Sequence, residues 1–432
     1  MYFLYDIVLF LATPLILVYD MVRAWRRRKR RKGIAERLGK YDAGMLTDLA
    51  GQKTVWVHAV SVGETIAVKP LIKALKEELP GIRIVLSNVT ETGRSIAEKS
   101  AGIDHCIYFP FDYHLTTKRA MARIRPALAI IVETEIWPNF LRAARERGIP
   151  VLLVNGRISD RSFPRYLSFR RFFRPVLANV SAFCMQTAED ARRIIAIGAE
   201  PDRVQVTGNL KYDIPVNALS SEKRRELRET FKVPGGAMVI IAGSTHAGEE
   251  ELILSAYQRL LAKGRECFLV LVPRHPERAA QVVGVLNNFA MRFTLRSALD
   301  QREGEFGAGE VLLVDTVGEL MRFYAISDIA FVGGSLVPTG GHNILEPASL
   351  GTPVVFGPHM HNFRESAALL LSGGGGFQVK DREELASLLL SLLDDPEKRS
   401  GAGRNGMRLL LENNGATKKQ MDVIKKMLAA GH

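Results

Sequence analysis

The chain has 432 residues, 47% of them hydrophobic and 24% charged, which is typical of a globular protein with two or three domains and ample core. Its three cysteines are scattered, which excludes a disulfide framework and a cysteine metal site. A net charge of +13 suits acidic substrates or anionic membranes, whereas no basic stripe interleaved with aromatic residues and no known motif points to nucleic acid as a partner.

The N-terminal stretch 2–22 is strongly apolar and, as a helix rising 1.5 Å per residue, would span a bilayer core. Asp6 and Pro14 weaken this interpretation, and the alternative is a buried helix. The stretch 23–32 is basic, and residues 1–32 hold eight Lys and Arg against two Asp, a net charge of +6. Positive charge after the apolar stretch predicts a retained membrane anchor with the remaining chain on the cytoplasmic side, rather than a cleaved signal peptide.

Strands then alternate with helices, which predicts a parallel sheet with helices on both faces. The expected strands are Val55–Val60, Ile82–Ser87, His105–Phe109, Ala127–Val132, Val151–Val154, 181–186 and 203–207, with helices at Thr65–Leu79, 92–100, 115–124 and 138–147. Polar side chains follow several of these strands, among them Glu64, Glu133 and Lys211. Because ligands gather at the carboxyl ends of parallel strands, this edge of the sheet is the expected site.

A polar segment, Pro215–Pro234, reads as a domain junction, and a second α/β region follows it. The predicted domains are therefore 1–32, an anchor with its basic segment, 33–220, an acceptor-binding Rossmann-like domain, and 221–432, a nucleotide-sugar-binding one. The expected strands of the last domain are Met238–Ala242, Cys267–Val272, Val311–Val314, Ile329–Val332 and Thr352–Phe356.

The segment between the last two of these strands contains two glycine pairs, Gly333-Gly334 and Gly340-Gly341. A helix is expected from His342 or Asn343 to Leu350, with Glu346 one turn inside it. Backbone N–H groups of such a loop and helix start can bind a phosphate, and Glu346 can accept hydrogen bonds from ribose hydroxyls. The alternative is an ordinary strand-to-helix turn that needs glycine for tight packing.

Two doubly wound halves with a nucleotide loop in the second half describe the GT-B glycosyltransferase architecture, and the chain contains no Asp-x-Asp pair. Seven motifs, in order along the chain, resemble those of the Kdo (3-deoxy-manno-octulosonic acid) transferases of lipid A biosynthesis. They are SVGET (61–65), ETEIWPN (133–139), GNLKYD (208–213), GSTHAGEEE (243–251), VPRHPER (272–278), DTVGEL (315–320) and GGHNILEPA (340–348). The apolar N-terminus also matches that family.

The resemblance implies an inverting, metal-independent transfer of Kdo from CMP-Kdo to a lipid A precursor (lipid IVA), at the cytoplasmic face of the inner membrane and without a cofactor. By resemblance, Glu64 is the general base, and Glu133 and Lys211 stabilise the transition state. The CMP contacts implied in the same way are Pro273, Arg274, Val317, Gly318, Glu319, Asn343, Ile344, Leu345 and Glu346. In the last group the side chains of Ile344 and Leu345 are expected to face the core.

Two alternatives remain open on the sequence alone. One is another GT-B enzyme acting on UDP-sugars, either a transferase or an epimerase. The other is a non-catalytic, membrane-docked lipid-binding protein, and Glu64 argues against it because a binding protein needs no base. For Glu64 itself the competing interpretation is simple capping of a helix N-terminus. No residue in the sequence sets the number of Kdo residues added.

Overall fold

The computed structural model describes residues 2–27, 32–42, 44, 46–216, 219–307 and 309–430. The chain folds as two compact units, unit 1 from Met1–Asp213 and Asn414–His432 and unit 2 from Ile214–Asn413. Residues 28–31 of the predicted basic segment lie outside the described residues.

Unit 1 is built on a parallel sheet of seven strands in the order β3-β2-β1-β4-β5-β6-β7. Its central strands are buried along their whole length, which explains why they read as continuous apolar runs rather than alternating ones. The strands are β1 Thr54–His58, β2 Arg83–Asn88, β3 His105–Tyr108, β4 Leu128–Val132, β5 Val151–Gly156, β6 Ala182–Met185 and β7 Val204–Val206.

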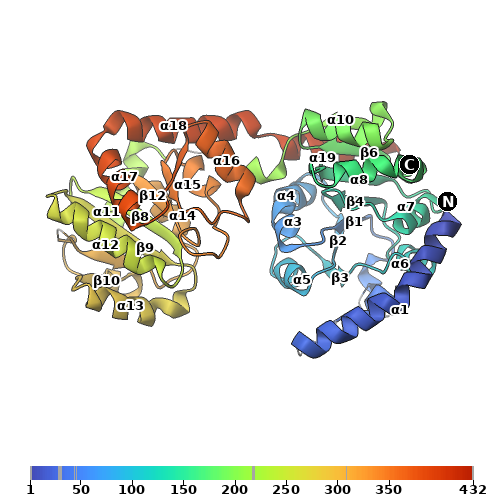
Figure 1. Cartoon of the computed structure of the whole chain (residues 1–432), viewed down its shortest axis with the longest axis horizontal. Coiled ribbons are helices and arrows are strands. Elements are labelled where there is room, and N and C mark those ends of the chain that lie inside the picture. The colour runs from blue at the N-terminus through green and yellow to red at the C-terminus, as the bar shows by residue number, and fades with distance from the viewer. Residues whose placement is uncertain are drawn as a thin grey trace. The chain divides into compact units, whose positions relative to one another are not determined.

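Helices cover both faces of this sheet (Figure 1). Successive residues of β1 point to opposite faces, so Trp56 joins one core cluster while Val55 and Val57 join the other. The helices are α2 Ile34–Arg37, α3 Val62–Ala67, α4 Lys69–Glu78, α5 Glu91–Glu98, α6 His114–Ile124, α7 Pro138–Arg145, α8 Phe163–Ser168, α9 Arg170–Leu177, α10 Ala188–Ile197 and α19 Ala416–Ala430.

The last helix, α19, belongs to unit 1, although the sequence placed all of 221–432 in the second domain. Ile424 is fully buried in the core of unit 1. The carboxylate of Asp213 accepts hydrogen bonds from the backbone N–H groups of Gly415 (2.6 Å) and Ala416 (3.1 Å), at the start of the helix. The boundary between the units therefore falls at 213 rather than 220, and the chain crosses it a second time at 413.

Unit 2 repeats the architecture, with seven parallel strands in the order β10-β11-β9-β8-β12-β13-β14. The strands are β8 Met238–Thr245, β9 Cys267–Pro273, β10 Phe293–Leu295, β11 Val311–Leu313, β12 Ile329–Val332, β13 Val354–Phe356 and β14 Gly376–Gln378. The helices are α11 Ser221–Thr230, α12 Glu249–Ala262, α13 Ala279–Asn288, α14 Leu320–Ile326, α15 Leu345–Ser349, α16 Arg364–Ser372, α17 Arg382–Asp394 and α18 Pro396–Asn413.

Both units are therefore doubly wound, as predicted, and each has a point where the chain switches from one side of its first strand to the other. In unit 1 this point lies at β1, between β2 and β4, and in unit 2 at β8, between β9 and β12. Ligands of open α/β sheets bind beside such points, at the carboxyl ends of the strands.

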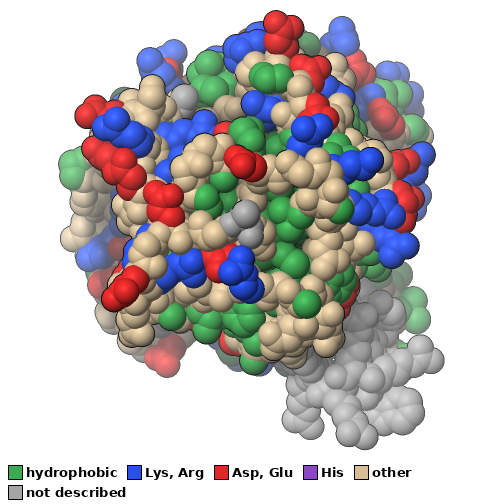
Figure 2. Space-filling model, turned by 90° about the vertical axis from the view of Figure 1, so that its left-hand side faces the viewer, with side chains coloured by type: hydrophobic (Ala, Val, Ile, Leu, Met, Phe, Trp, Pro, Cys, Tyr) green, Lys and Arg blue, Asp and Glu red, His purple; other side chains and the backbone are tan. Residues whose placement is uncertain are grey.

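The end of unit 2 that faces the viewer in Figure 2 has acidic and basic side chains intermingled on its surface.

Three details of the prediction are wrong. The short strands β10 and β14 were not predicted, and the helix expected over Thr65–Leu79 is two helices, α3 and α4, that meet at Val68. The interruption follows from Pro70, which has no N–H to continue the hydrogen-bond pattern of α3. The helix expected from His342 or Asn343 begins at Leu345 and has five residues.

The N-terminal helix is α1, Tyr2–Arg27. Within the described part of the chain, no helix is both long enough and apolar enough to cross a membrane. The predicted membrane anchor is therefore not confirmed and stays a prediction. The first part of α1 docks on unit 1, because the hydroxyl of Tyr5 donates to Asp112 (2.9 Å) and Asp6 accepts from the amide of Asn139 (2.7 Å). The helix also exposes large apolar side chains, Phe3, Leu4, Phe10, Leu11 and Leu15.

Candidate active site

Glu64 lies in the first turn of α3, directly after β1, and its carboxylate is held in place by hydrogen bonds. One oxygen accepts from the backbone N–H of Val60 (2.7 Å) and the other from the hydroxyl of Ser61 (2.8 Å), while Ser61 in turn accepts from the backbone N–H of Glu64 (3.4 Å). This is a capping box, so the capping interpretation of Glu64 is correct as far as it goes. Capping does not use the full capacity of the carboxylate, because a carboxylate has about four lone-pair positions and Glu64 accepts two well-formed hydrogen bonds among the described residues.

Glu64 is only 8% exposed and lies near two further acidic residues that follow β4, Glu133 and Glu135. Burial raises the pKa of Glu64, and the negative charge of Glu133 adds to this, against the hydrogen bonds from Val60 and Ser61. Burial, followed by the charges of Glu64 and Glu133, raises the pKa of Glu135 to about 7. Raised carboxyl pKa values of this kind are typical of sites that perform acid–base chemistry near neutral pH.

Glu133 has a backbone conformation that L residues rarely adopt, with φ at 59°. Its N–H donates to the carbonyl of Val154 (2.9 Å), which fixes the turn at the end of β4. Its carboxylate lies 3.7 Å from the ammonium of Lys211. The side chain of Lys211 is 34% exposed and that of Glu133 is 27% exposed. The structure thus brings Glu64, Glu133 and Lys211 to the same edge of the sheet of unit 1, as the sequence predicted. Strained backbone at such a point is common in functional sites.

Two asparagines to which the sequence assigned no role in catalysis position Lys211. The side chain of Asn209 accepts from the backbone N–H of Lys211 (3.0 Å), and that of Asn155 accepts from the N–H of Leu210 (3.0 Å). Asn155 also has a positive φ, 53°, at the carboxyl end of β5. For Asn155 the signal in the sequence is an Asn at a strand end, since Asn tolerates this conformation better than most residues.

The candidate nucleotide residues of unit 2 follow three different strands. Pro273 ends β9 and is buried, and the side chain of Arg274 after it is exposed. Burial raises the pKa of Glu346, while the amide of Asn343 (Nδ2 to Oε1, 3.1 Å) and the positive charge of Arg274 oppose this. Arg274 is therefore close enough to Glu346 to interact with it electrostatically. Ile344 and Leu345 are buried at 0% and 2%, which confirms that they face the core.

The predicted segment 317–319 follows β11 and divides into an exposed part and a fixed part. Val317 is 84% exposed, and Gly318 has a φ of 90°. The carboxylate of Glu319 accepts from Arg296 (3.1 Å), Arg322 (3.2 Å) and the hydroxyl of Thr316 (2.6 Å). The backbone of Val317 and Gly318 is thus accessible to a ligand, whereas the Glu319 side chain holds the loop together.

In the glycine loop after β12, three backbone N–H groups that follow the first glycine of the loop are already bonded and are not offered to a phosphate, whereas phosphate binding by the second glycine pair and the helix start stays a prediction. The carboxylate of Glu249, the first residue of α12, accepts from the backbone N–H groups of Gly334 (2.7 Å), Ser335 and Leu336 (both 2.9 Å). A Cβ at Gly333 would lie 2.5 Å from the carbonyl oxygen of Ser244. Gly333 serves close packing, and Glu249 organises the loop.

Three histidines lie beside the glycine loop. The Nε2 atoms of His246 and His342 are 2.8 Å apart with the rings nearly parallel, and the ring of His275 is perpendicular to that of His246 at 6.1 Å. Burial, followed by the neighbouring positive charges of His246, Arg274 and His275, lowers the pKa of His342 to about 4. At neutral pH one neutral ring therefore donates to the other, and the pair joins the loop after β8 to the loop after β12.

Within the described residues, no group of three or more His, Cys, Asp or Glu side chains is arranged to hold a metal ion. The two units thus offer different chemistry. Unit 1 has buried carboxylates of raised pKa next to a lysine, and unit 2 has an exposed arginine and polar loop backbone at the edge where nucleotides bind. This division suits group transfer between two substrates.

Comparison with known proteins identifies the family. Residues 32–214 match the family described as 3-deoxy-D-manno-octulosonic-acid transferase (kdotransferase). A 3-deoxy-D-manno-octulosonic acid transferase of Haemophilus influenzae is 35% identical over 99% of this chain and 98% of its own length. The chain belongs to the Kdo transferase family. The enzyme of the same name from Bordetella pertussis is 33% identical over 94% of this chain and 95% of its own.

This Kdo transferase also resembles a solved structure of MurG from Acinetobacter baumannii, with a TM-score of 0.53, 14% identity, and coverage of 87% of this chain and 99% of that one. At that identity the likeness shows the fold alone, and it confirms the GT-B architecture. The protein is a Kdo glycosyltransferase of lipopolysaccharide biosynthesis, which sets it apart from the epimerases and non-catalytic lipid-binding proteins left open by the sequence.

Proposed function

We propose that this Kdo transferase moves Kdo from CMP-Kdo onto a phosphorylated lipid A precursor, lipid IVA, with inversion at the anomeric carbon and without a metal ion. The observation that carries the proposal is Glu64, a buried carboxylate of raised pKa that retains unused lone pairs beside the Glu133–Lys211 pair. A general base needs this combination of fixed orientation, remaining basicity and nearby charge.

In the reaction, Glu64 accepts the proton of the acceptor hydroxyl as that oxygen forms its bond to the anomeric carbon of Kdo. The bond from this carbon to the phosphate oxygen of CMP breaks, and its electron pair stays on the phosphate. A single displacement of this kind inverts the carbon. Lys211 offsets the negative charge that develops as the proton leaves the acceptor hydroxyl and the phosphate leaves the sugar. Glu133 orients Lys211 and supports positive charge on the sugar.

The donor is held by unit 2. Arg274 is exposed at the end of β9 and binds the phosphate, because a guanidinium can donate to two phosphate oxygens at once. Glu346, held by Asn343, accepts from the ribose hydroxyls. Pro273, Ile344 and Leu345 shape the site. The backbone of Val317 and Gly318, with the loop fixed by Glu319, contacts the base.

The enzyme works at the cytoplasmic face of the inner membrane, and α1 provides the membrane contact. Phe3 and Phe10 are 77% and 74% exposed on a helix that is held to the sheet-bearing part of unit 1 through Tyr5 and Asp6. Exposed apolar side chains on one face of a helix, followed by a basic stretch, favour contact with anionic lipid. Phe10→Asp, compared with wild type in flotation with anionic vesicles, should reduce recovery with the vesicles, and unchanged recovery would contradict this part of the proposal.

The experiment that tests the proposed reaction is a transfer assay in detergent with CMP-Kdo, lipid IVA and excess EDTA, with the products read by mass. The expected result is one or more mass increments of Kdo on the lipid, undiminished by EDTA. The number of increments also gives the number of sugars added. No increment from protein that still binds CMP would overturn the proposal, and a requirement for added metal would overturn its metal-independent part.

A further inference from the structure

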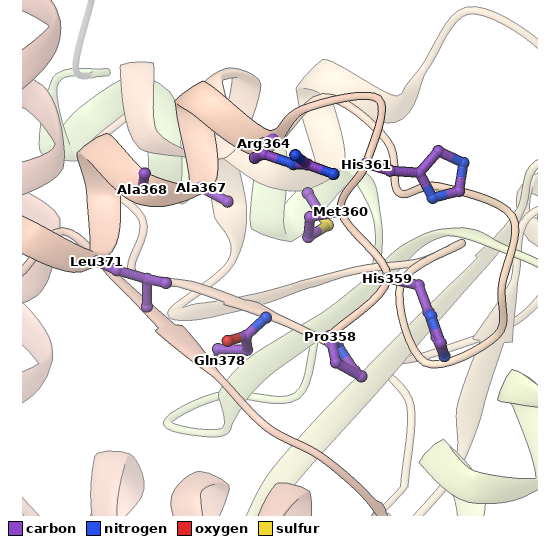
Figure 3. Close-up of a pocket in the computed structure, with 9 residues that line it drawn as sticks. All are labelled: Pro358, His359, Met360, His361, Arg364, Ala367, Ala368, Leu371 and Gln378. Atoms are coloured by element: carbon purple, nitrogen blue, oxygen red, sulfur yellow. The ribbon is translucent and has the colours of Figure 1, made fainter. Parts of the chain in front are cut away.

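A hollow of about 420 Å³ lies in unit 2 at the carboxyl ends of β13 and β14, beside α16 (Figure 3). We call it the α16 pocket. In Figure 3, Leu371, Ala368 and Ala367 of α16 line one side, the loop after β13 lines the other, and Gln378 reaches in from β14. The lining residues are Pro358, His359, Met360, His361, Arg364, Ala367, Ala368, Leu371 and Gln378. None of these residues is among those the family resemblance assigned to the site.

The polar groups of the pocket favour an anionic ligand. Arg364, the first residue of α16, is exposed and has no hydrogen-bond or ion-pair partner among the described residues. The amide of Gln378 adds a further donor, and among the described residues no carboxylate lines the pocket, while the imidazoles of His359 and His361 are directed away from Gln378 and Leu371 in Figure 3. The buried Met360 and the side chain of Leu371 supply an apolar wall. A guanidinium with a neutral donor and an apolar wall fits a small carboxylate-bearing sugar.

The wall of the α16 pocket is packed directly on the glycine loop. The N–H of Asn362 donates to the carbonyl of Gly340 (3.0 Å), and the N–H of His359 donates to the carbonyl of Ser335 (2.9 Å). A Cβ at Gly340 would lie 2.6 Å from Nε2 of His361. The same loop continues into Asn343 and Glu346, so a ligand in the pocket would lie beside the residues proposed to bind the nucleotide.

We propose that the α16 pocket is the subsite for the sugar acid of the donor, with Arg364 binding its carboxylate and Gln378 donating to its hydroxyls. This proposal rests on the proposed function, because it takes the donor to be a nucleotide linked to an acidic sugar. It explains why the enzyme would prefer an acidic sugar over a neutral one, since a neutral sugar would leave the guanidinium without its anion.

The test is a binding measurement without acceptor, so that it does not depend on catalysis. CMP and CMP-Kdo are titrated into full-length wild type, Arg364→Gln and Arg364→Lys. Wild type should bind CMP-Kdo more tightly than CMP. Arg364→Gln should weaken CMP-Kdo binding about tenfold or more and leave CMP binding unchanged, as expected for the loss of a charge-assisted pair. Arg364→Lys should fall between the two, because it keeps the charge and loses the bidentate geometry.

Arg404→Gln is the matched control, since it removes the same charge from an exposed position on α18 of the same unit. Equal effects of Arg364→Gln and Arg404→Gln would overturn the proposal, as would an equal loss of CMP and CMP-Kdo binding in Arg364→Gln. In the transfer assay, a rise in the acceptor KM with unchanged CMP-Kdo binding would assign the pocket to an acceptor phosphate instead. A wild type that prefers CMP-Kdo to CMP and yet transfers nothing would refute the proposed function and support the pocket.

Discussion

Unit 1 and unit 2 each place a glutamate in the first turn of the helix that follows their first strand. In unit 1 it is Glu64, after β1, and in unit 2 it is Glu249, after β8. Both carboxylates accept hydrogen bonds from the backbone. Glu64 accepts two hydrogen bonds, from Val60 and Ser61. Glu249 accepts four, from Gly334, Ser335, Leu336 and His246, and is fully buried.

The number of hydrogen bonds distinguishes a carboxylate that can act as a base from a carboxylate with a structural role. The four bonds to Glu249 use all of its lone-pair positions, so it has no capacity left to take a proton from a substrate. Glu64 has two positions left, a raised pKa, and Lys211 and Glu133 nearby. Residue type is the same in both units, and both glutamates lie in the first turn of the helix after the strand, Glu64 as the third residue of α3 and Glu249 as the first residue of α12. What differs is how many donors the surrounding loop directs at the carboxylate.

The largest expected effect is on transfer activity when Glu64 is replaced. Glu64→Gln should lower kcat by about 10²- to 10⁴-fold, because an amide cannot act as a base. The fold should be unaffected, since Gln serves in a capping box as Glu does. The assay for Kdo transfer measures the first effect and a urea denaturation midpoint the second.

Ser61→Ala is the control, because it removes a capping partner and leaves the carboxylate. It should cost about 1 kcal/mol of stability and keep most of the activity. If Ser61→Ala and Glu64→Gln lost activity equally, Glu64 would be a structural residue like Glu249.

The next effect is on stability in unit 2. Glu249→Gln replaces one acceptor oxygen by an NH2 group that faces backbone donors, which should destabilise the fold by about 2–5 kcal/mol. Urea denaturation followed by fluorescence measures this. Glu251→Gln, an exposed position in the same turn of α12, is the matched control and should change stability by less than about 0.5 kcal/mol. A Glu249→Gln variant as stable as this control would show that the loop does not depend on the carboxylate.

A smaller effect is expected for the cation of unit 1. Lys211→Met should lower kcat by about 10- to 100-fold, because charge that develops in the reaction loses its counter-charge and Glu133 loses its partner at 3.7 Å. The donor KM should change little. Lys73→Met, an exposed lysine of α4, controls for the loss of one positive charge. Equal activity of the two variants would remove Lys211 from the mechanism.

The smallest effect concerns pH and Glu135. Burial and the charges of Glu64 and Glu133 raise its pKa to about 7, above the value in the unfolded chain, so the folded state binds the proton more tightly. This contribution to stability is fully present below about pH 4.5 and is lost as pH rises toward 7. Glu135→Gln should therefore match wild type at low pH and be more stable, on the order of 1 kcal/mol or more, at pH 8. Parallel stability curves across this range would contradict the raised pKa.

Much of the fold could be predicted because it depends on patterns among residues that are close together in the sequence. Strands buried on both faces, such as β4 and β12, appear as short β-branched runs, and their alternation with helices determines a parallel sheet. The edge strands β10 and β14 were missed because each is short and only partly buried, so neither appears as a buried apolar run, unlike the equally short β11 and β13. The placement of α19 in unit 1 depends on Asp213 and on contacts of Ile424 with residues far away in sequence.

The site was predicted where strand ends and charged residues coincide, as at Glu64, Glu133 and Lys211. The part of the site in which a carboxylate binds the backbone of a segment distant in the sequence was not predicted. Glu249 lies 85 residues before Gly334, and no local pattern says that its side chain will take the N–H groups of that loop. The helix expected at His342 starts at Leu345 for a related reason, because Asn343 folds back to accept from the N–H of Leu345 (3.2 Å) rather than beginning the helix.

The most direct test measures Glu64→Gln and Glu249→Gln side by side, each for transfer at saturating CMP-Kdo and for its urea denaturation midpoint. We expect opposite patterns. Glu64→Gln should lose activity and keep its midpoint, whereas Glu249→Gln should shift its midpoint and, in the fraction that remains folded, retain the ability to remove the acceptor proton. Loss of stability without a specific loss of activity in Glu64→Gln would contradict its role as the base.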